Sequence, residues 1–315
     1  MPPMPGRARS LADALGEEVL VLDGGLSNQL RAQGCDLSDA LWSARLLADG
    51  PEQIEAAHTA YVRAGARVLI TASYQATFEG FARRGIDRAG AGRLLARSVE
   101  LAREAADAAE GGEGAAGTGR QVWVAGSVGP YGAMLADGSE YRGRYGLTVR
   151  ELERFHRPRV EALVAAGPDV LALETVPDTE EAEALLRAVE GCGVPVWLSY
   201  TIDGERTRAG QALTEAFALT AGNDQVIAVG VNCCEPGDAA RAVEIAAGTT
   251  GKPVVVYPNS GERWDARARG WHGSVTFDAG RMREWPAAGA RLLGGCCRIG
   301  PDRIAELAAA VTSPP

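Results

Sequence analysis

Short apolar runs alternate with longer helical patterns along almost the whole sequence. Eight runs rich in apolar and β-branched residues are short and continuous, which is typical of strands buried on both faces of a parallel sheet. These predicted strands are Val19–Leu22, Arg67–Thr71, Val122–Ala125, Val170–Leu173, Val194–Ser199, Val226–Val231, Pro253–Tyr257 and Arg291–Leu293.

The segments between most of these runs predict helices. Pro51–Ala64 has proline in its first turn and is followed by glycine, which suits a helix start and stop. Ala89–Ala109 is rich in strong helix formers. Thr148 and Glu151 form a capping-box pattern that opens a helix towards Ala166. Further helices are predicted at Ala182–Val189, Thr214–Ala221, Gly237–Ala247, Ala279–Ala288 and Asp302–Val311.

Eight strands that alternate with helices predict an α/β fold of the (β/α)8 TIM barrel type. The 315 residues are a normal length for one such barrel. We therefore expect residues 1–315 to form a single domain, with an ordered core from about residue 15 to about residue 312. An open doubly wound sheet is the alternative. It usually has fewer strands, and Asp23–Asn28 lacks the glycine pattern of a dinucleotide site.

The charge balance restricts the partners of the chain. Its 41 acidic and 32 basic residues give a formal net charge of −9, which argues against nucleic acid as a partner. No apolar run approaches the length of a membrane span, and Met1–Ser10 lacks the apolar centre of a signal peptide. These observations predict a cytoplasmic protein with reduced thiols and no membrane partner. They leave the oligomeric state open, with a monomer as the working expectation.

Two pairs of adjacent cysteines are the most informative chemical feature. Cys296 and Cys297 follow two glycines, which allow close approach of backbone and ligands. Adjacent cysteines rarely bridge each other, but both can reach one metal ion if the backbone turns between them. Cys233 follows Asn232 in a similar setting and could supply a third ligand. Thiolate-rich sites favour zinc, and ordinary packing of buried cysteines is the alternative.

The other three cysteines are expected to pack rather than to bind a ligand. Cys35 and Cys192 stand alone, and cysteine is among the most buried residue types. Neighbouring side chains of a strand point to opposite faces. Cys234 should therefore pack outward if Cys233 faces the barrel axis.

Polar residues follow several predicted strands, at the end where barrels place their chemistry. Asp23 and Glu174 follow buried strands, where an unpaired carboxylate is costly. For Asp23, a salt bridge or a helix cap explains the position equally well. Glu174 has no basic residue beside it in the sequence, which favours ligand binding. Asn232 and Asn259 occupy equivalent strand ends and are candidate substrate contacts.

Several stretches resemble one known family. They are Asp23–Gly25, Leu41–Ser43, Ile70–Ala76, Leu135–Gly143, Glu174–Thr175, Gly230–Cys233, Tyr257–Glu262 and Gly294–Cys297. The chain resembles the homocysteine S-methyltransferases, in the branch that uses S-methylmethionine, from about Val19 to Ile304. The resemblance implies a (β/α)8 barrel with zinc held by Cys233, Cys296 and Cys297. It also implies homocysteine contacts from the residues Asp23, Gly24, Thr71 or Ser73, and Glu174.

This resemblance implies zinc-dependent methyl transfer from S-methylmethionine to the thiol of L-homocysteine, which gives methionine. S-adenosylmethionine is a second candidate donor because it is also a sulfonium. Aromatic faces attract such cations, and Trp42, Tyr74 and Tyr131 are the candidate contacts. Two alternatives stay open: a barrel methyltransferase with betaine or another donor, and a non-catalytic zinc or thiol sensor. The strand-end carboxylates argue against the sensor, since a structural zinc site needs neither.

Overall fold

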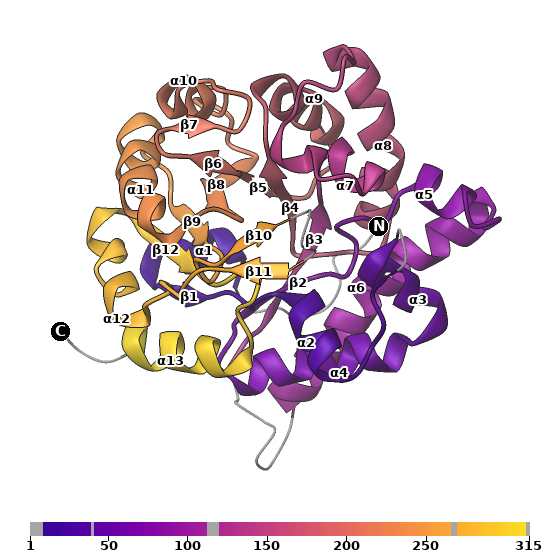
Figure 1. Cartoon of the computed structure of the whole chain (residues 1–315), viewed down its shortest axis with the longest axis horizontal. Helices are drawn as coiled ribbons and strands as arrows, with labels where there is room; N and C mark the ends of the chain where they lie inside the picture. Colours follow the sequence, from indigo (N-terminus) through magenta and orange to yellow (C-terminus); the bar gives the residue numbers. More distant parts are fainter. Residues whose placement is uncertain (1–8, 39–40, 112–119, 266–269, 313–315) are drawn as a thin grey trace.

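Eight parallel strands form a barrel in the computed structural model, which describes residues 9–38, 41–111, 120–265 and 270–312 (Figure 1). The strands are β1 (Leu20–Val21), β2 (Val68–Ile70), β3 (Trp123–Val128), β4 (Val170–Val176), β5 (Val196–Tyr200), β8 (Val226–Asn232), β9 (Val254–Tyr257) and β12 (Ala290–Leu293). Their order is β1-β12-β9-β8-β5-β4-β3-β2. A parallel bridge between Leu22 and Val68 joins the first strand to the last in that order. The predicted (β/α)8 barrel is confirmed, and every predicted run overlaps one strand.

Helices surround the barrel in Figure 1, except for α1, which lies behind the strands in this view. They are α1 (Leu11–Glu17), α2 (Leu26–Ala32), α3 (Leu46–Asp49), α4 (Pro51–Arg63), α5 (Phe78–Ala82), α6 (Arg88–Gly111), α7 (Tyr131–Leu135), α8 (Val149–Ala165), α9 (Thr179–Val189), α10 (Leu213–Ala218), α11 (Pro236–Thr250), α12 (Ala279–Met282) and α13 (Pro301–Thr312). Two antiparallel hairpins follow strands β5 and β9 along the chain. They are β6 (Ile202–Asp203) with β7 (Arg206–Thr207), and β10 (Arg263–Asp265) with β11 (Gly270–His272).

Local sequence signals explain where the outer helices begin and end. The predicted capping box opens α8: the Thr148 hydroxyl accepts a hydrogen bond from the Glu151 amide, and the Glu151 carboxylate accepts one from the Thr148 amide. The single helix predicted over Ala279–Ala288 is wrong in extent. Helix α12 ends at Met282, and a separate 3-10 turn covers Trp285–Ala288. Pro286 lies in that turn. Proline lacks the amide hydrogen that a helix continuing from α12 would need at this position, so the helix stops before it.

Two apolar clusters fill the molecule. The larger cluster packs between the strands and the outer helices and includes Cys234, as predicted for a side chain that points outward. The smaller cluster lies among inward-facing strand residues, including Trp123 and Trp197. Leu11 and Leu15 of α1 join the smaller cluster, and Trp123, the first residue of β3, donates a hydrogen bond to the Arg9 carbonyl. Helix α1 therefore covers the amino-terminal end of the barrel and leaves the carboxyl end for the site.

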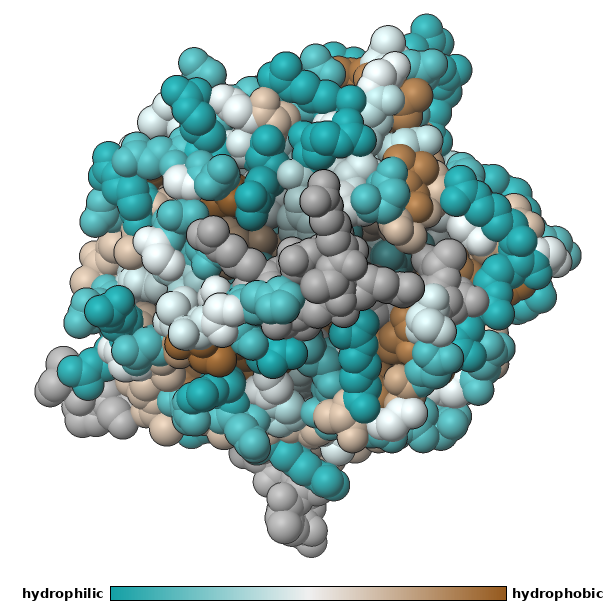
Figure 2. All heavy atoms as spheres, viewed as in Figure 1, coloured by the Kyte–Doolittle hydropathy of each residue, from teal (hydrophilic) through white to brown (hydrophobic). Residues whose placement is uncertain are grey.

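The face drawn in Figure 2 is mostly hydrophilic, with small apolar areas scattered over it. Within the ranges that the structure describes, no helix combines the length and the apolar character needed to cross a membrane. The cytoplasmic location, the monomeric state and the single-domain assignment of residues 1–315 stay predictions.

Candidate metal centre and substrate pocket

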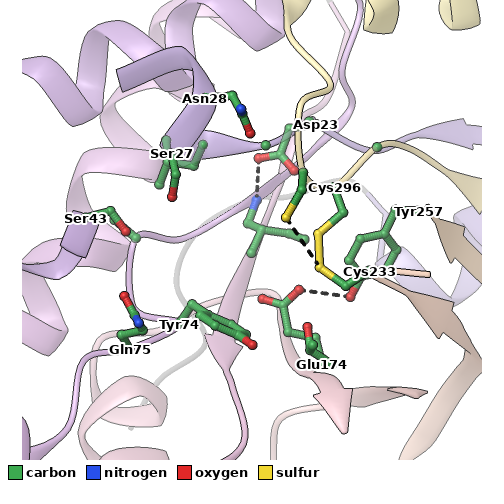
Figure 3. Close-up of a pocket in the computed structure, with 18 of the residues that line it drawn as sticks. Asp23, Ser27, Asn28, Ser43, Tyr74, Gln75, Glu174, Cys233, Tyr257 and Cys296 are labelled. Atoms are coloured by element: carbon green, nitrogen blue, oxygen red, sulfur yellow. Dashed lines mark hydrogen bonds between the residues drawn. A yellow bond between two sulfur atoms is a disulfide. The ribbon is translucent and has the colours of Figure 1, made fainter. Parts of the chain in front are cut away.

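Three cysteine sulfur atoms meet at the carboxyl end of the strands. Cys233 follows β8, and Cys296 and Cys297 follow β12; their Sγ atoms all lie within 4.8 Å of one another. Cys233 and Cys296 form a disulfide, and the Cys233 and Cys297 Sγ atoms are 3.9 Å apart (Figure 3). Tetrahedral zinc with Zn–S bonds of about 2.3 Å requires sulfur atoms about 3.8 Å apart. The cluster therefore fits one such ion once the disulfide is reduced, because the thiolate is the metal ligand.

The backbone around Cys296 and Cys297 is held by hydrogen bonds from neighbouring loops. The Cys296 amide donates to the Pro258 carbonyl at 2.8 Å, and the Cys297 amide donates to the Asn259 side-chain oxygen at 3.0 Å. A Cβ at Gly295 would collide with the side chain of Ile299. The turn that aims both sulfur atoms at Cys233 therefore needs glycine and fixed acceptors on the adjacent loop.

We expect Asn259→Ala to weaken zinc binding about 10- to 100-fold, the range for partners that orient metal ligands. The alanine removes the acceptor for the Cys297 amide but leaves all three sulfur atoms in the chain. Competition with a zinc chelator on reduced protein measures the affinity. Asn259→Asp keeps an acceptor oxygen and is the matched control. Equal zinc affinity in the alanine variant and the native chain would contradict this role.

Two buried carboxylates lie in the same pocket as the sulfur atoms (Figure 3). Asp23 Oδ2 accepts a hydrogen bond from the Ile70 amide at 2.9 Å, while Oδ1 has no partner among the described residues. Glu174 accepts hydrogen bonds from the hydroxyl groups of Ser127 and Tyr257. Burial raises the pKa of Asp23, helped by the charge of Glu174, and raises the pKa of Glu174 to about 7. A cationic group such as an ammonium would compensate this buried negative charge.

The raised pKa of Glu174 predicts that the contribution of this residue to the stability of the ligand-free protein falls as the pH rises from about 4.5 to about 7, whereas the lowered pKa values of the buried His58 and His156 act in the opposite direction. Over this range the folded state retains the Glu174 proton and the unfolded state releases it, so the titration of this residue favours unfolding as the pH rises. Burial also raises the pKa of Asp23 and of Glu181, which act in the same direction as Glu174. Glu174→Gln should remove the contribution of Glu174, because an amide does not titrate.

Urea unfolding of the reduced, metal-free protein between pH 5 and pH 8 measures this contribution. Glu161→Gln, on the exposed face of α8, is the matched control. The same pH dependence of stability in Glu174→Gln and the native chain would contradict the assignment.

The pocket wall includes eight of the residues predicted for the site. They are Asp23, Gly24, Thr71, Tyr74, Glu174, Cys233, Cys296 and Cys297. Gly24 has no room for a side chain, since a Cβ there would lie 2.8 Å from a ring carbon of Tyr61. Ser73 is buried behind Thr71: the two hydroxyl groups are 2.7 Å apart, and Ser73 donates to the Ser127 carbonyl. Of the two alternatives, Thr71 is therefore the residue that reaches the pocket.

Besides Ser73, three predicted contacts do not lie on this wall. Asn232 is buried behind Thr175: its side chain accepts from the Thr175 amide at 2.7 Å and donates to the Thr175 hydroxyl at 2.7 Å. Asn259 binds the Cys297 amide, as described above. Tyr131 packs its ring against Tyr145 and Phe155. The Trp42 side chain lies outside the described part of the chain.

The structure adds wall residues that sequence reasoning missed. They are Ser27, Asn28, Arg31, Ser43, Gln75, Tyr141 and Tyr257 among others. Four of them lie within stretches that carried the family resemblance: Ser43 in Leu41–Ser43, Gln75 in Ile70–Ala76, Tyr141 in Leu135–Gly143 and Tyr257 in Tyr257–Glu262. Burial raises the pKa of the Cys297 thiol to about 11, and the nearby Tyr141 hydroxyl acts in the opposite direction.

Fold and pocket together define a (β/α)8 barrel with a cysteine cluster that could hold a metal ion at the carboxyl end of its strands. The family model for homocysteine S-methyltransferase matches residues 20–311. The chain belongs to the homocysteine S-methyltransferase family and is an enzyme of that activity. The family and the enzyme class predicted from sequence are confirmed, and the non-catalytic sensor is set aside.

Individual relatives are similar to this chain over nearly its full length. A homocysteine S-methyltransferase of Escherichia coli K12 is 48% identical over 306 residues, covering 96% of this chain and 97% of the relative. The metallated form of the Escherichia coli homocysteine methyltransferase MmuM superposes with a TM-score of 0.83 at 46% identity, covering 93% of this chain and 96% of that one. Its oxidized form gives a TM-score of 0.83 at 45% identity, covering 96% and 98%.

Proposed function

We propose that this enzyme transfers a methyl group from S-methylmethionine to the thiol of L-homocysteine and that it requires zinc on Cys233, Cys296 and Cys297. Both products are methionine. S-adenosylmethionine, with a similar sulfonium, is a second donor. The observation that carries the proposal is the convergence of three sulfur atoms within 4.8 Å in a pocket that also contains the buried Asp23 and Glu174. The similarity to a metallated homocysteine methyltransferase supports the metal.

Different pocket residues bind different groups of homocysteine. Its ammonium group is received by Asp23 Oδ1, which lacks another partner among the described residues, and by Glu174. Gly24 leaves the amino acid room to approach, and Thr71 lines the same wall. Zinc on the three thiolates would supply a Lewis acid with one open ligand position, which favours the thiolate form of a thiol whose ordinary pKa is about 8.5. The thiol proton leaves to water.

Methyl transfer then needs alignment more than acid–base chemistry. The homocysteine sulfur forms a bond to the methyl carbon while the bond from that carbon to the sulfonium sulfur breaks. The electron pair of the broken bond stays on the departing sulfur, which leaves as a neutral thioether without a general acid. Tyr74 and Tyr141 line the pocket beside Glu174 and offer aromatic faces to the sulfonium. Holding both sulfur atoms in line can supply several kcal/mol of the rate acceleration.

The Cys233–Cys296 disulfide excludes the zinc-bound state, because both sulfur atoms are needed as thiolates. The similarity to an oxidized form of the same Escherichia coli enzyme supports two redox states of this cluster. The active enzyme must therefore be prepared under reducing conditions.

An assay with deuterium-labelled homocysteine tests the proposal. Reduced, zinc-loaded enzyme receives labelled homocysteine and one donor at a time: S-methylmethionine, S-adenosylmethionine or betaine. S-methylmethionine should give one labelled and one unlabelled methionine per turnover, and removal of zinc should stop the reaction. Labelled methionine from betaine alone would contradict the donor, and full activity without zinc would contradict the metal.

A further inference from the structure

One end of the pocket contains none of the residues to which we assign homocysteine binding. Figure 3 shows Ser27, Ser43 and Gln75 across the pocket from Cys233 and Tyr257. Arg31 lines the same pocket and follows Ser27 by four residues in α2, so both side chains lie on one face of that helix. Among the described residues that line the pocket, Arg31 is the only one with a basic side chain.

The charges of the substrates make Arg31 significant. Homocysteine and S-methylmethionine each carry an ammonium and a carboxylate group, and S-methylmethionine also carries the sulfonium. The charged wall residues other than the cysteines are Asp23, Glu174 and Arg31. Both acidic groups suit an ammonium or a sulfonium, so Arg31 alone offers full positive charge to a carboxylate.

These charged groups lie at different depths in the pocket, which gives the two substrates different positions. Asp23 and Glu174 are 1% and 5% exposed and share the inner pocket with the sulfur atoms, whereas the Arg31 side chain is exposed. The acceptor must bring its thiol to the cysteine cluster, so it occupies the inner position. The donor then binds on the outer side, with its sulfonium towards that thiol and its carboxylate towards the rim.

We propose that Arg31 binds the carboxylate of the methyl donor and thereby selects amino-acid sulfonium compounds over those without a carboxylate. This inference rests on the proposed function. The guanidinium group presents a planar pair of donors that matches a carboxylate.

Two hydrogen bonds join the start of α2, the helix that carries Arg31, to the loop that follows the paired cysteines. The Asn28 side-chain oxygen accepts from the Arg298 amide at 2.7 Å, and the Gly25 amide donates to the Ile299 carbonyl at 2.8 Å.

Steady-state kinetics with two matched donors test the assignment. The donors are S-methylmethionine and (3-aminopropyl)dimethylsulfonium, which is the same molecule without its carboxylate. We expect Arg31→Met to reduce kcat/KM for S-methylmethionine about 10- to 100-fold, the range for a lost charge-assisted hydrogen bond. The kcat/KM for the truncated donor and the KM for homocysteine should each change less than about threefold. Arg31→Lys should recover part of the loss, because it restores the charge without the planar fork.

Arg63→Met, an exposed arginine of α4 that does not line the pocket, is the matched control and should behave like the native chain. A rise in the KM for homocysteine with unchanged use of S-methylmethionine would assign Arg31 to the acceptor and overturn the inference. Equal losses with both donors would overturn it as well. Native enzyme that uses neither sulfonium would refute the proposed function together with the inference, so the two failures are distinguishable.

Discussion

Cys297→Ser should bind less than a tenth of the zinc of the native enzyme and lose more than about 100-fold in methyl transfer. Partners that merely orient metal ligands are worth 10- to 100-fold, so loss of a ligand should cost more. The Cys297 sulfur atom lies 3.9 Å from that of Cys233, close to the spacing that tetrahedral zinc needs. A hydroxyl is a far weaker zinc ligand than a thiolate. Elemental analysis of reduced, dialysed protein gives the zinc content, and the labelled-homocysteine assay gives the rate.

Cys192→Ser is the matched control for this substitution. Cys192 is half-buried near Gln225 and lies outside the pocket, so its serine variant should keep both zinc and activity. Native zinc content and rate in Cys297→Ser would falsify the three-sulfur site. Native zinc with lost activity would contradict the ligand role and leave Cys297 a role at the substrate.

Asp23→Asn should lower kcat/KM for homocysteine by roughly 30- to 5,000-fold, the equivalent of 2–5 kcal/mol for a buried charge pair that loses one partner. The amide keeps the shape of the side chain and an oxygen that accepts from the Ile70 amide. It removes the negative charge that we assign to the homocysteine ammonium. Initial rates at varied homocysteine and saturating S-methylmethionine measure the loss.

The same substitution should stabilise the enzyme in the absence of substrate. Burial raises the pKa of Asp23 because the folded protein disfavours its charged form, and the asparagine variant avoids that cost. We expect Tm of the ligand-free variant to rise while activity falls, a common trade-off at functional sites. Asp169→Asn is the matched control: this residue accepts a hydrogen bond from the Val124 amide and pairs with Arg103 away from the pocket. It should lose stability and keep its KM for homocysteine.

The barrel was predictable because most of its strands are short apolar runs that are buried on both faces. The same regularity identified the strand ends, so Asp23, Glu174 and the three cysteines could be assigned to one end of the barrel before any contact was known. Helix boundaries were predictable where the sequence contains a capping motif, as at Thr148. They failed over Ala279–Ala288, where α12 ends at Met282 because Pro286, four residues later, cannot donate the backbone hydrogen bond that a continuing helix needs.

The contacts of the loops could not be read from the sequence. Asn232 and Asn259 occupy strand ends, as predicted, but their amides bind backbone groups of Thr175 and Cys297. These contacts depend on backbone conformations that no sequence pattern predicts, such as the left-handed conformation of Thr175. Tyr131 and Tyr141 both lie in the segment that connects β3 to α8, and only the path of this segment in space decides that Tyr141 lines the pocket. Arg31 was missed because it lies on a seven-residue helix without a strong sequence signal.

The pairing of β1 with β12 has a consequence for synthesis of the chain on the ribosome. Cys233 is made 63 residues before Cys296, and the strand that presents the later pair also completes the wall of the barrel. No partial chain that ends before this strand can assemble the three-sulfur cluster. Because translation adds about 5–20 residues per second, at least about 3 seconds pass between the synthesis of Cys233 and that of Cys296. A nascent chain can therefore form neither the three-sulfur cluster that we assign to zinc nor the Cys233–Cys296 disulfide until β12 and the two cysteines that follow it have emerged.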